Sequence, residues 1–362
     1  MRILRVTQKT YPDVKGGAPY HTHAMSRDQA KMGHHVTLLT VRQDPELPHI
    51  EEREGYTIVR YDPVAAPLGN DISPELAQYL RTAEDFDVIH AHSHLYFATN
   101  LAALKRRLGD IPLALTNHGL FSQNAPEWVF DLYLRTVGRW TFNQADVIFC
   151  YTEADRERVR EYGVTSPIEV VSNGIDTERF TPEGSTSELI DAEGPVVLFV
   201  GRLVEGKRPA VAIEAFAEVR RSVPEAELYL CGEGPLQSTL VELAAELGVR
   251  EAVTFLGQVP YEEMPTVYRG ADVLVLPSRA EGVPRTIMEA LASGVSVVSS
   301  DLDQVRSAFG DELAYAKSGD VEDFTEGIEL AFSTQSTGAL GKQFNWKQTV
   351  AETTSKLESI LV

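Results

Sequence analysis

The stretch Thr181-Pro-Glu-Gly-Ser-Thr-Ser187, together with Pro195-Val-Val-Leu-Phe-Val-Gly201 shortly after it, decides the fold. The first run is polar and rich in Pro, Gly and Ser, which is typical of a linker between domains. The second is a short apolar run that ends at a glycine, which is typical of a buried strand. The sequence therefore predicts a linker over 181–194 and a new domain that begins at residue 195.

On both sides of this linker, short β-branched runs alternate with longer segments that carry apolar residues at three- and four-residue spacing. Such alternation is typical of parallel sheets with helices on both faces. We predict an α/β protein with two Rossmann-like domains, 1–180 and 195–343, and a C-terminal helical segment, 344–362, that packs back on the first domain. The predicted strands are 2–7, 35–40, 57–61, 87–91, 112–116, 146–150, 168–171, 196–200, 227–231, 252–256, 272–276 and 295–299, and the predicted helices include 20–32, 73–83, 96–108 and 209–222.

Composition narrows the class of protein. The 362 residues suit two domains, and the net charge of −20 disfavours nucleic acid as a partner. No apolar run approaches the roughly 18 residues that a membrane-spanning helix needs, and the N-terminus lacks the pattern of a signal peptide, so we expect a cytoplasmic location. Cys150 and Cys231 lie in strand-like runs, where we expect small buried hydrophobes.

In parallel sheets, ligands bind beyond the carboxyl ends of the strands. The loop Gly201-Arg-Leu-Val-Glu-Gly-Lys207-Arg208 follows a predicted strand and differs by one residue from a phosphate-binding Walker A loop. Arg208 stands at the position of the magnesium ligand, which disfavours an NTPase. Arg202 and Lys207 remain suited to holding a diphosphate. The alternative is two solvated surface cations.

The run Glu281-Gly-Val-Pro-Arg-Thr-Ile-Met-Glu289 follows the predicted strand 272–276. Pro284 suits the first position of a helix, whose free amides attract phosphate. Glu281 and Glu289 would accept hydrogen bonds from ribose or sugar hydroxyls. The alternative is an amphipathic helix with two solvated glutamates.

Glu281-x7-Glu289 and the following Ala290-Leu-Ala-Ser-Gly294 resemble the signature of family 4 retaining glycosyltransferases of the GT-B fold. Other motifs of that family occur in order along nearly the whole chain. They are Gly16-Gly17, Gly33-His-His-Val36, Asp87-Val-Ile-His-Ala-His92, Thr116-Asn-His-Gly119, Ser172-Asn-Gly-Ile-Asp176, Val200-Gly-Arg-Leu203, Gly232-Glu-Gly-Pro235 and Phe255-Leu-Gly257.

The resemblance implies a hexosyltransferase that holds a nucleotide-diphosphate sugar in a cleft between the domains and passes the sugar to a glycan or a lipid-linked acceptor. It implies that Arg202 and Lys207 bind the diphosphate, that Glu289 binds the ribose, and that Glu281 and His118 lie at the donor sugar. The base would rest near Val259. The other donor-binding positions that it implies are Gly16, Gly17, Gly201, Gly234, Gly282, Val283, Arg285 and Thr286. Neither a metal nor another cofactor is expected.

The chain departs from the family pattern at two places. Many members have Gly where Pro284 stands, so one backbone donor is missing, and Arg285 is a candidate to replace it. Asp303-Gln-Val-Arg-Ser307 stands where the family often has Gly-Gly-x-x-Glu. Both places lie near the expected donor sugar, whose identity stays open.

Two groups of residues could bind a metal, contrary to the expectation that the donor is held without one. His90, His92 and His94 alternate along a strand end and could line one face as metal ligands. The triplets Asp85-Phe-Asp87 and Asp301-Leu-Asp303 resemble the metal motif of the other large glycosyltransferase class. The first triplet precedes a strand, and Arg202 and Lys207 already supply the positive charge that a metal would bring to the diphosphate.

His21 and His23 are expected to be exposed helix residues.

The segment from Trp128 to Phe142 is rich in aromatic and aliphatic residues and carries Arg135 and Arg139. A helix here could lie on the inner face of a membrane near a lipid-linked acceptor, although such helices more often belong to a core.

Two other functions remain open. One is a non-catalytic sugar-nucleotide-binding subunit, and the other is an epimerase or hydrolase with the same fold and donor.

The charge balance predicts a dependence of stability on salt. Acidic residues number 53 against 33 basic ones, of which only 9 are lysine, and this pattern is typical of proteins from salt-loving microbes. Because salt screens the repulsion among carboxylates, we expect the unfolding temperature to rise as KCl increases from dilute buffer to molar concentration. An unfolding temperature that is the same in dilute buffer and in molar KCl would contradict the halophilic interpretation.

Overall fold

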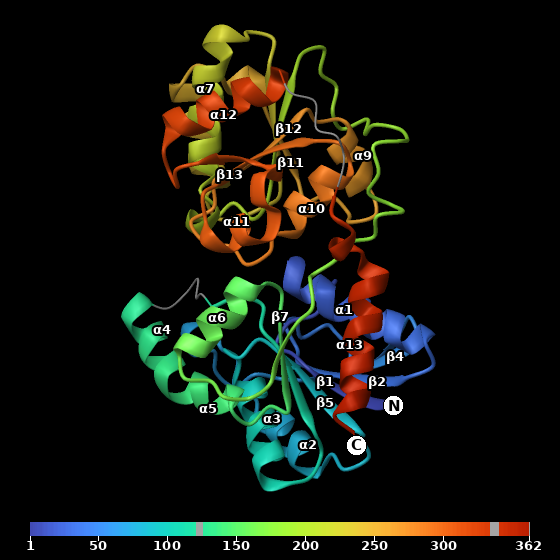
Figure 1. Ribbon diagram of the computed structural model, residues 1–362. Helices are drawn as coiled ribbons and strands as arrows, with labels where there is room; N and C mark the ends of the chain where they lie inside the picture. Colours follow the sequence, from blue (N-terminus) through green and yellow to red (C-terminus); the bar gives the residue numbers. More distant parts are fainter. Residues whose placement is uncertain (121–125, 334–339, 362) are drawn as a thin grey trace. The chain divides into compact units, whose positions relative to one another are not determined.

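A computed structural model describes residues 1–120, 126–333 and 340–361 (Figure 1). The chain forms two compact units, Met1–Ser172 with Lys347–Val362, and Asn173–Trp346. The first crossing between the units therefore precedes residue 181, where the predicted linker begins. The reason is that the residues just after Ser172 pack in the second unit. Ile175 forms a β-bridge with Asn345, and the buried ring of Phe180 packs against Tyr261.

The first unit is built on one eight-stranded sheet with the order β3-β4-β2-β1-β5-β6-β7-β8, in which only the β3–β4 pair is antiparallel. The chain runs outward from β1 in one direction and from β5 in the other, so the order of the strands reverses between these two neighbours. The strands are β1 (Arg2–Val6), β2 (His35–Val41), β3 (Ile50–Arg53), β4 (Tyr56–Tyr61), β5 (Val88–His92), β6 (Leu113–Thr116), β7 (Val147–Cys150) and β8 (Ile168–Val170).

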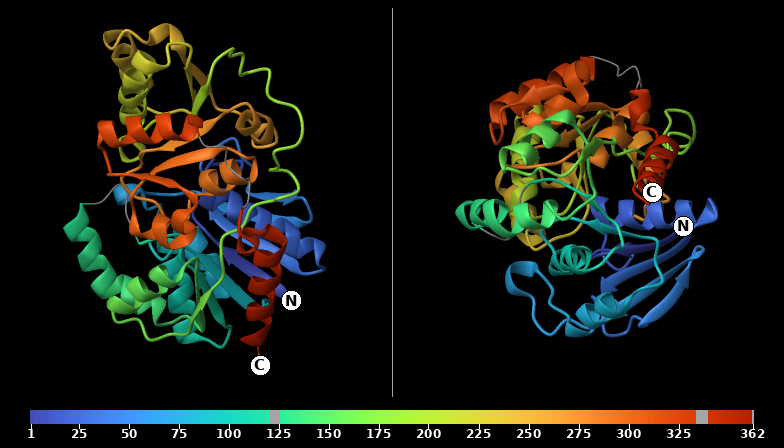
Figure 2. Two further views of the ribbon diagram at one scale, coloured as in Figure 1. Left: turned by 45° about the horizontal axis from the view of Figure 1, so that its top comes forward. Right: turned by 60° about the horizontal axis from the view of Figure 1, so that its bottom comes forward.

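Helices cover both faces of this sheet. They are α1 (Gly17–Lys31), α2 (Pro74–Thr82), α3 (Phe97–Leu108), α4 (Glu127–Tyr133), α5 (Arg139–Phe142), α6 (Glu153–Glu161) and α13 (Trp346–Ser359), with short turns η1 (Pro67–Gly69) and η2 (Leu134–Gly138). One core lies between the sheet and α2, α3 and α5, and a smaller one includes Ile3 and Leu357. Helix α13 lies beside α1, as Figures 1 and 2 show, and the Gln29 side chain donates to Thr354 Oγ1 at 2.9 Å.

The second unit has a six-stranded, fully parallel sheet with the order β11-β10-β9-β12-β13-β14. Its strands are β9 (Val196–Val200), β10 (Glu227–Cys231), β11 (Val253–Gly257), β12 (Val273–Leu276), β13 (Ser296–Ser300) and β14 (Ala314–Ala316). Its helices are α7 (Pro209–Ser222), α8 (Gln237–Glu246), α9 (Met264–Arg269), α10 (Arg285–Ala292), α11 (Asp303–Phe309) and α12 (Val321–Ser333), with short turns η3 (Glu205–Lys207), η4 (Arg250–Ala252), η5 (Gly310–Glu312) and η6 (Lys342–Phe344).

The helices of the second unit also form two layers. In Figure 1, α7 and α12 lie on one side of the strands and α9 and α10 on the other. The two central strands, β9 and β12, are continuously apolar, as expected where both faces of a sheet are covered. Phe199, Phe216 and Phe324 are fully buried in the core between the sheet and the layer of α7 and α12. The prediction of two Rossmann-like domains is confirmed.

All twelve predicted strands are present, and no end differs from the predicted end by more than one residue. Two strands are additional. Strand β3, Ile50-Glu-Glu-Arg53, is a polar edge strand without a buried face, and β14 has only three residues. Neither has the apolar alternation by which a strand is recognised in a sequence.

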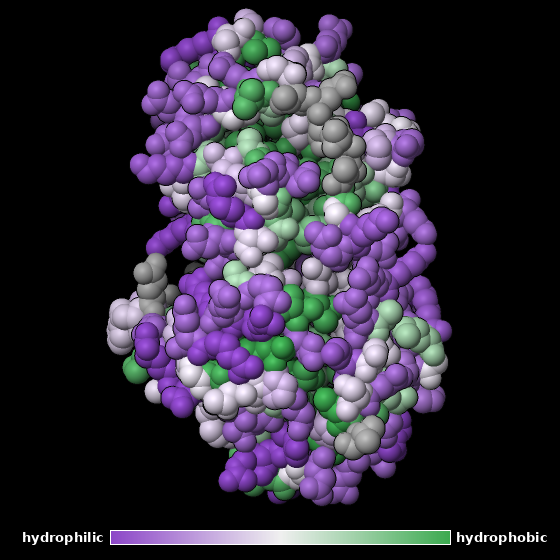
Figure 3. All heavy atoms as spheres, in the orientation of Figure 1, coloured by the Kyte–Doolittle hydropathy of each residue, from purple (hydrophilic) through white to green (hydrophobic). Residues whose placement is uncertain are grey.

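The structure also bears on the two cysteines and on the surface. Cys150 and Cys231 are buried and unbridged, as predicted, and burial raises the pKa of their thiols to about 12 and about 11. The face of the protein drawn in Figure 3 is largely hydrophilic over both units. Within the described part of the chain, no helix is long and apolar enough to cross a membrane.

Candidate functional site

The loops that follow β9 and β12 meet at the centre of the second unit's sheet. These strands are neighbours, and the chain runs outward from them in opposite directions, which makes their carboxyl ends a topological switch point. The backbone N–H of Arg279, after β12, donates to the Gly206 carbonyl, after β9, at 2.9 Å. The Lys207 ammonium donates to the Glu281 carboxylate and forms an ion pair with it. The sheet thus brings the predicted residues of the two loops together.

The exposure of these side chains decides between a binding site and a solvated surface. Glu281 is only 9% exposed and Lys207 only 19%, so their ion pair is largely withdrawn from water. Arg202, in contrast, is exposed on the same loop as Lys207. The interpretation of Glu281 as a solvated glutamate is wrong. A phosphate that reached this loop would find one cation held in place by Glu281 and a second one more accessible.

Helix α10 begins at Arg285, one residue later than predicted. Pro284 precedes it as the N-cap in an extended conformation, with φ −69° and ψ 123°. The first turn contains Arg285 and Thr286 and no acidic residue, so its backbone amides keep the partial positive charge of a helix N-terminus. Gly282 and the buried Val283 form the preceding turn. The helix therefore presents an anion-attracting end beside Glu281.

Glu289 lies in α10 and is 4% exposed. The Tyr261 hydroxyl donates to its Oε1 at 2.9 Å, and the Tyr268 hydroxyl donates to its Oε2 at 3.0 Å. Burial, together with the charge of Glu289, raises the pKa of Tyr268 well above its ordinary value, so this hydroxyl remains a donor. The two tyrosines, which the sequence analysis missed, fix the orientation of the carboxylate.

The loop after β10 supports the loop that carries Arg202. The Leu203 N–H donates to the Glu233 carbonyl at 2.9 Å, and a Cβ atom on Gly234 would lie 2.3 Å from the Leu203 carbonyl oxygen. Such a contact excludes any side chain at position 234 unless the backbone shifts. Gly234 is therefore explained by the packing of two loops, whereas a Cβ atom on Gly201 would meet only ordinary contacts. Val259, after β11, is 9% exposed.

In the first unit, the predicted residues Gly16, Gly17 and His118 follow β1 and β6, whose carboxyl ends lie at the same edge of the sheet as those of β5 and β7. Gly16 immediately precedes α1 and has φ +150°, a conformation that favours glycine, and Gly17 is the first residue of the helix. His92 ends β5, His118 follows β6, and Tyr151 follows β7. The reversal of strand order between β1 and β5 lies in the middle of this set.

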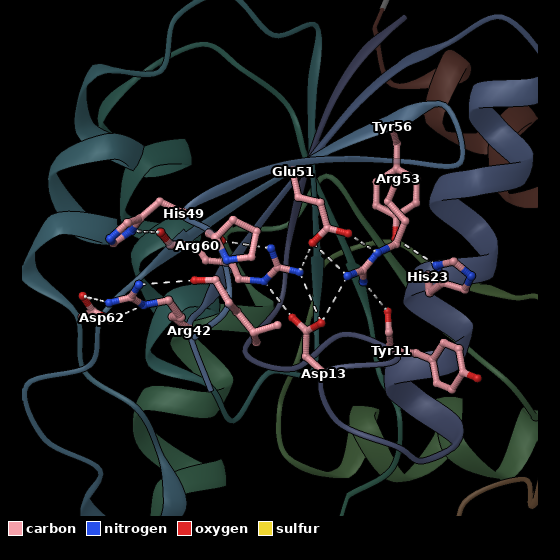
Figure 4. Close-up of polar contacts among 12 residues, drawn as sticks. Tyr11, Asp13, His23, Arg42, His49, Glu51, Arg53, Tyr56, Arg60 and Asp62 are labelled. Atoms are coloured by element: carbon pink, nitrogen blue, oxygen red, sulfur yellow. Dashed lines mark hydrogen bonds and ion pairs between the residues drawn. The ribbon is translucent and has the colours of Figure 1, made fainter. Parts of the chain in front are cut away.

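A buried cluster of charges holds the loop that leads to Gly16 (Figure 4). Asp13, whose side chain is 2% exposed, accepts from Arg60 Nε at 2.7 Å and from Arg53 Nη2 at 3.3 Å. Glu51 accepts from both arginines, at 2.8 Å from Arg60 and 2.7 Å from Arg53. The Arg60 side chain is fully buried. The additional β3–β4 hairpin thus anchors the loop that places the glycine pair.

His118 is held by two neighbours. Its Nδ1 lies 2.8 Å from the Tyr151 hydroxyl, and its Nε2 lies 3.1 Å from Nδ1 of His92. The ring of His21 packs edge-on against it, with centroids 5.3 Å apart. Burial lowers the pKa of His118 to about 4. The imidazole is therefore neutral at physiological pH and serves as a donor or acceptor of hydrogen bonds, not as a cation.

His21 and His23 are 3% and 4% exposed, so the prediction that they are exposed helix residues is wrong. His21 packs against His92, His118 and Tyr151, and Nδ1 of His23 lies 2.8 Å from the Tyr56 hydroxyl. The reason is that this turn of α1 faces the sheet edge, although its sequence is polar.

The two parts of the chain match two family models. Residues 15–179 match the model of Glycosyltransferase Family 4, and residues 181–348 match that of Glycosyl transferases group 1. D-inositol 3-phosphate glycosyltransferase from Corynebacterium aurimucosum is 31% identical over an alignment that covers 91% of this chain and 87% of that protein. The chain belongs to glycosyltransferase family 4. It is an enzyme that transfers a sugar from a nucleotide donor.

Another curated relative and two solved structures are also similar to this glycosyltransferase. The GDP-mannose-dependent alpha-(1-6)-phosphatidylinositol monomannoside mannosyltransferase of Mycolicibacterium smegmatis is 28% identical, with 86% of this chain and 89% of that protein covered. Among solved structures, sucrose-phosphate synthase from Thermosynechococcus elongatus has a TM-score of 0.80 at 20% identity, with 99% and 98% of the two chains covered. Anabaena HepE in complex with UDP and glucose has a TM-score of 0.79 at 18% identity, with 99% and 100% covered. These structural neighbours show the GT-B fold.

The residues weighed as metal ligands have other partners in the glycosyltransferase. His90 lies 2.8 Å from Thr116 Oγ1 and 3.3 Å from the buried guanidinium of Arg5, whose charge would repel a cation. The ring of His94 stacks on Phe142. Asp87 pairs with Arg2, and Asp301 with Arg306. Outside the gaps at 121–125, 334–339 and 362, no group of three His, Cys, Asp or Glu residues is arranged to hold a metal ion.

The buried environment of His118 predicts the pH at which its imidazole takes up a proton. Because burial favours the neutral ring, the imidazole should stay neutral as the pH falls below 6.5 and take up a proton only near pH 4. The unfolded chain binds this proton already near pH 6.5, so the contribution of His118 to stability is complete above that pH and is lost as the pH falls toward 4. NMR of labelled histidine, assigned with His118→Gln, measures the midpoint. A midpoint near 6.5 would contradict this environment.

Proposed function

We propose that the chain transfers a hexosyl group from a nucleoside diphosphate sugar to a hydroxyl of a glycan or a lipid-linked acceptor, with retention of the anomeric configuration and without a metal. The observation that carries the proposal is the junction of the loops after β9 and β12, where Lys207, Glu281 and the N-terminus of α10 lie together. Arg202 and Lys207 offer the charge that a diphosphate requires. Glu289 offers a buried, oriented carboxylate for the ribose hydroxyls.

In the proposed reaction, negative charge grows on the leaving diphosphate as the bond to the sugar breaks. Arg202, Lys207 and the first amides of α10 stabilise that charge, and fixed charges of this kind lower a reaction barrier by several kcal/mol. The acceptor hydroxyl attacks from the face that the diphosphate leaves and passes its proton to an oxygen of the departing diphosphate, so configuration is retained without a carboxylate nucleophile. His118 positions the donor sugar as a neutral hydrogen-bonding group. Glu281 holds the Lys207 ammonium in place.

The loops that would hold the diphosphate support the proposal of metal independence. A metal ion serves such enzymes by neutralising the diphosphate, and two cationic side chains beside a helix N-terminus supply the same charge. The sugar transfer should therefore persist in EDTA. The non-catalytic alternative is disfavoured because His118, Arg202, Lys207, Glu281 and Glu289 are all present. The epimerase or hydrolase alternative predicts turnover of the donor without an acceptor.

Removal of both cations tests the donor site. In Arg202→Ala/Lys207→Ala we expect the affinity for UDP or GDP to fall by on the order of 100-fold, because each charged hydrogen bond contributes about 1.5–3 kcal/mol. Isothermal titration calorimetry measures the affinity. Arg221→Ala is the matched control, since it removes an exposed arginine of the same unit that pairs with Glu218 on α7.

His118→Ala separates binding from catalysis in the same assays. This variant should bind the nucleotide as the wild type does and lose most of the sugar transfer. Unchanged nucleotide affinity in the double variant would remove Arg202 and Lys207 from the site, and undiminished transfer by His118→Ala would refute its role.

We further propose that the first unit, which would take the acceptor, touches the cytoplasmic face of a membrane. This proposal is supported by the exposed surface of α4, η2 and α5, on which Trp128 is 72% exposed, Leu132 55% and Trp140 38%. Arg135 and Arg139 are exposed on the same segment. Aromatic side chains beside cations are typical of a helix that lies on an anionic lipid surface. The expectation that this segment belongs mainly to a core does not apply to these residues.

Flotation with phosphatidylglycerol vesicles tests this contact. The wild type should float with the vesicles, and Trp128→Ser/Trp140→Ser should remain in the unbound fraction because the apolar anchors are lost. Leu247→Ser, which removes an exposed leucine of the second unit, is the control and should float as the wild type does. Equal flotation of the wild type and the double tryptophan variant would contradict the proposed contact.

A further inference from the structure

The chain crosses between the two units twice, and the two crossing segments are paired just inside the second unit. Ile175 and Asn345 form a parallel bridge, in which the Ile175 N–H donates to the Phe344 carbonyl and the Trp346 N–H donates to the Ile175 carbonyl, both at 2.9 Å. The Asn345 side chain also donates to Thr177 Oγ1 at 3.1 Å. We call residues 174–177 and 344–346 the crossing ribbon. The units connect at Ser172–Asn173 and Trp346–Lys347, so the ribbon lies next to both connections.

Arg285 is attached to the crossing ribbon. Its Nη1 donates to the Gly174 carbonyl at 2.7 Å, and its guanidinium carbon lies 5.9 Å from the centroid of the Trp346 ring. Arg285 is only 8% exposed. Because a buried guanidinium is stable only where its N–H groups find acceptors, its position is tied to the position of the ribbon. One side chain thus contacts both strands of the ribbon.

The other end of the same guanidinium leads to Glu289. Arg285 Nη2 donates to the Tyr261 hydroxyl oxygen at 2.9 Å, and that hydroxyl donates its own hydrogen to Glu289 Oε1 at 2.9 Å. The donors and acceptors therefore run in one direction, from the cation through the tyrosine to the carboxylate. The Nε atom of Arg285 also lies 3.6 Å from Glu289 Oε1. Hydrogen bonds arranged in such a chain polarise and strengthen one another.

We propose that Arg285 and Tyr261 couple the nucleotide site to the crossing ribbon, so that a nucleotide at Glu289 stiffens the segments that connect the two units. The proposal rests on the proposed function in one respect, namely that Glu289 accepts hydrogen bonds from the ribose. Ribose hydroxyls on the carboxylate restrict its rotation, and the restriction passes through Tyr261 to the guanidinium that holds Gly174. Arg285 and Tyr261 are positioning residues in this account. By thermodynamic linkage, a ribbon that is already ordered binds the nucleotide more tightly.

A purely structural role for Arg285 makes a different prediction. It would stabilise the ribbon equally with and without nucleotide, and Tyr261 would matter only through packing. The two roles differ in how nucleotide changes the exchange of two amide hydrogens, those of Ile175 and Trp346, whose hydrogen bonds close the ribbon. Hydrogen exchange reports the opening of such local bonds directly.

The experiment measures hydrogen–deuterium exchange at the Ile175 and Trp346 amides in the full chain, alone and with saturating UDP, GDP or ADP. In the wild type, the nucleotide that binds should slow exchange at both amides by about tenfold. Tyr261→Phe keeps the Arg285–Gly174 bond and removes the hydrogen-bonded link to Glu289, leaving only the 3.6 Å ion pair of Arg285 Nε. Its exchange without nucleotide should therefore match the wild type, and the nucleotide should slow it much less.

Two arginine variants complete the test. Arg285→Gln should exchange about tenfold faster than the wild type even without nucleotide, and Arg285→Lys, which keeps the charge and one donor, should retain the ribbon and lose the nucleotide effect. Arg221→Gln, which changes an exposed arginine of α7, is the control and should behave as the wild type. An equal nucleotide effect in the wild type, Tyr261→Phe and Arg285→Lys would overturn the coupling. Nucleotide binding without slower exchange in the wild type would also overturn it, whereas failure of all three nucleotides to bind would refute the proposed function itself.

Discussion

The ion pair between Lys207 and Glu281 is the interaction on which the account of the second unit depends. It joins the loops after β9 and β12, the two central strands from which the chain departs in opposite directions. The backbone bond from Arg279 to Gly206 reinforces the same junction. A lysine beside a helix N-terminus would otherwise be a flexible surface cation. Glu281 restrains it at the place where a diphosphate would meet the amides of α10. Preorganised charge of this kind needs little rearrangement when a reaction develops negative charge.

In the first unit, a network of buried ion pairs holds the loop that precedes the glycine pair. Buried Asp13 and Arg60, with Glu51 and Arg53, fasten the loop before Gly16 to an edge hairpin. A network of buried ions is costly to dehydrate, so its presence here is best explained by the loop that it places rather than by stability alone. His118 lies between Tyr151 and His92 at the same edge of the sheet. Neutral histidines, such as the stacked rings of His92 and His118, tolerate the removal of water that a charged cluster would resist.

Patterns that lie within a short stretch of sequence predicted most of the fold. The strands were predicted correctly because each buried run is apolar and ends at a turn. Arg202 and Lys207 were chosen as candidates because their loop directly follows such a run, and Glu281 and Glu289 because of their spacing and their resemblance to the family. Tyr261 and Tyr268 were missed because they reach Glu289 across 28 and 21 residues, a distance at which spacing carries no information. The burial of His21 and His23 was missed for a related reason. A polar turn of helix is expected to face water unless a polar site lies beneath it.

The polar groups around Glu289 in the proposed donor site therefore come from separate elements that only the folded sheet brings together. Tyr261 follows β11, Tyr268 lies on α9, and Glu289 and Arg285 lie on α10. Arg285 stands next to the proline that departs from the family pattern. It is the first residue of α10, and Thr286 follows it in the first turn. Through its contacts with Gly174 and Tyr261, a side chain in the first turn of the helix proposed to bind the nucleotide also contacts the segment that leads to the other unit.

The central claim is that the junction of the loops after β9 and β12 binds a diphosphate. The most direct test compares the affinities of the wild-type protein for a nucleoside, its monophosphate and its diphosphate, with uridine, guanosine and adenosine as the bases. If the claim is right, the affinity rises with each phosphate, and the best diphosphate binds on the order of 100-fold more tightly than its nucleoside, since each phosphate gains charged hydrogen bonds. Equal affinity for a nucleoside and its diphosphate would contradict the claim.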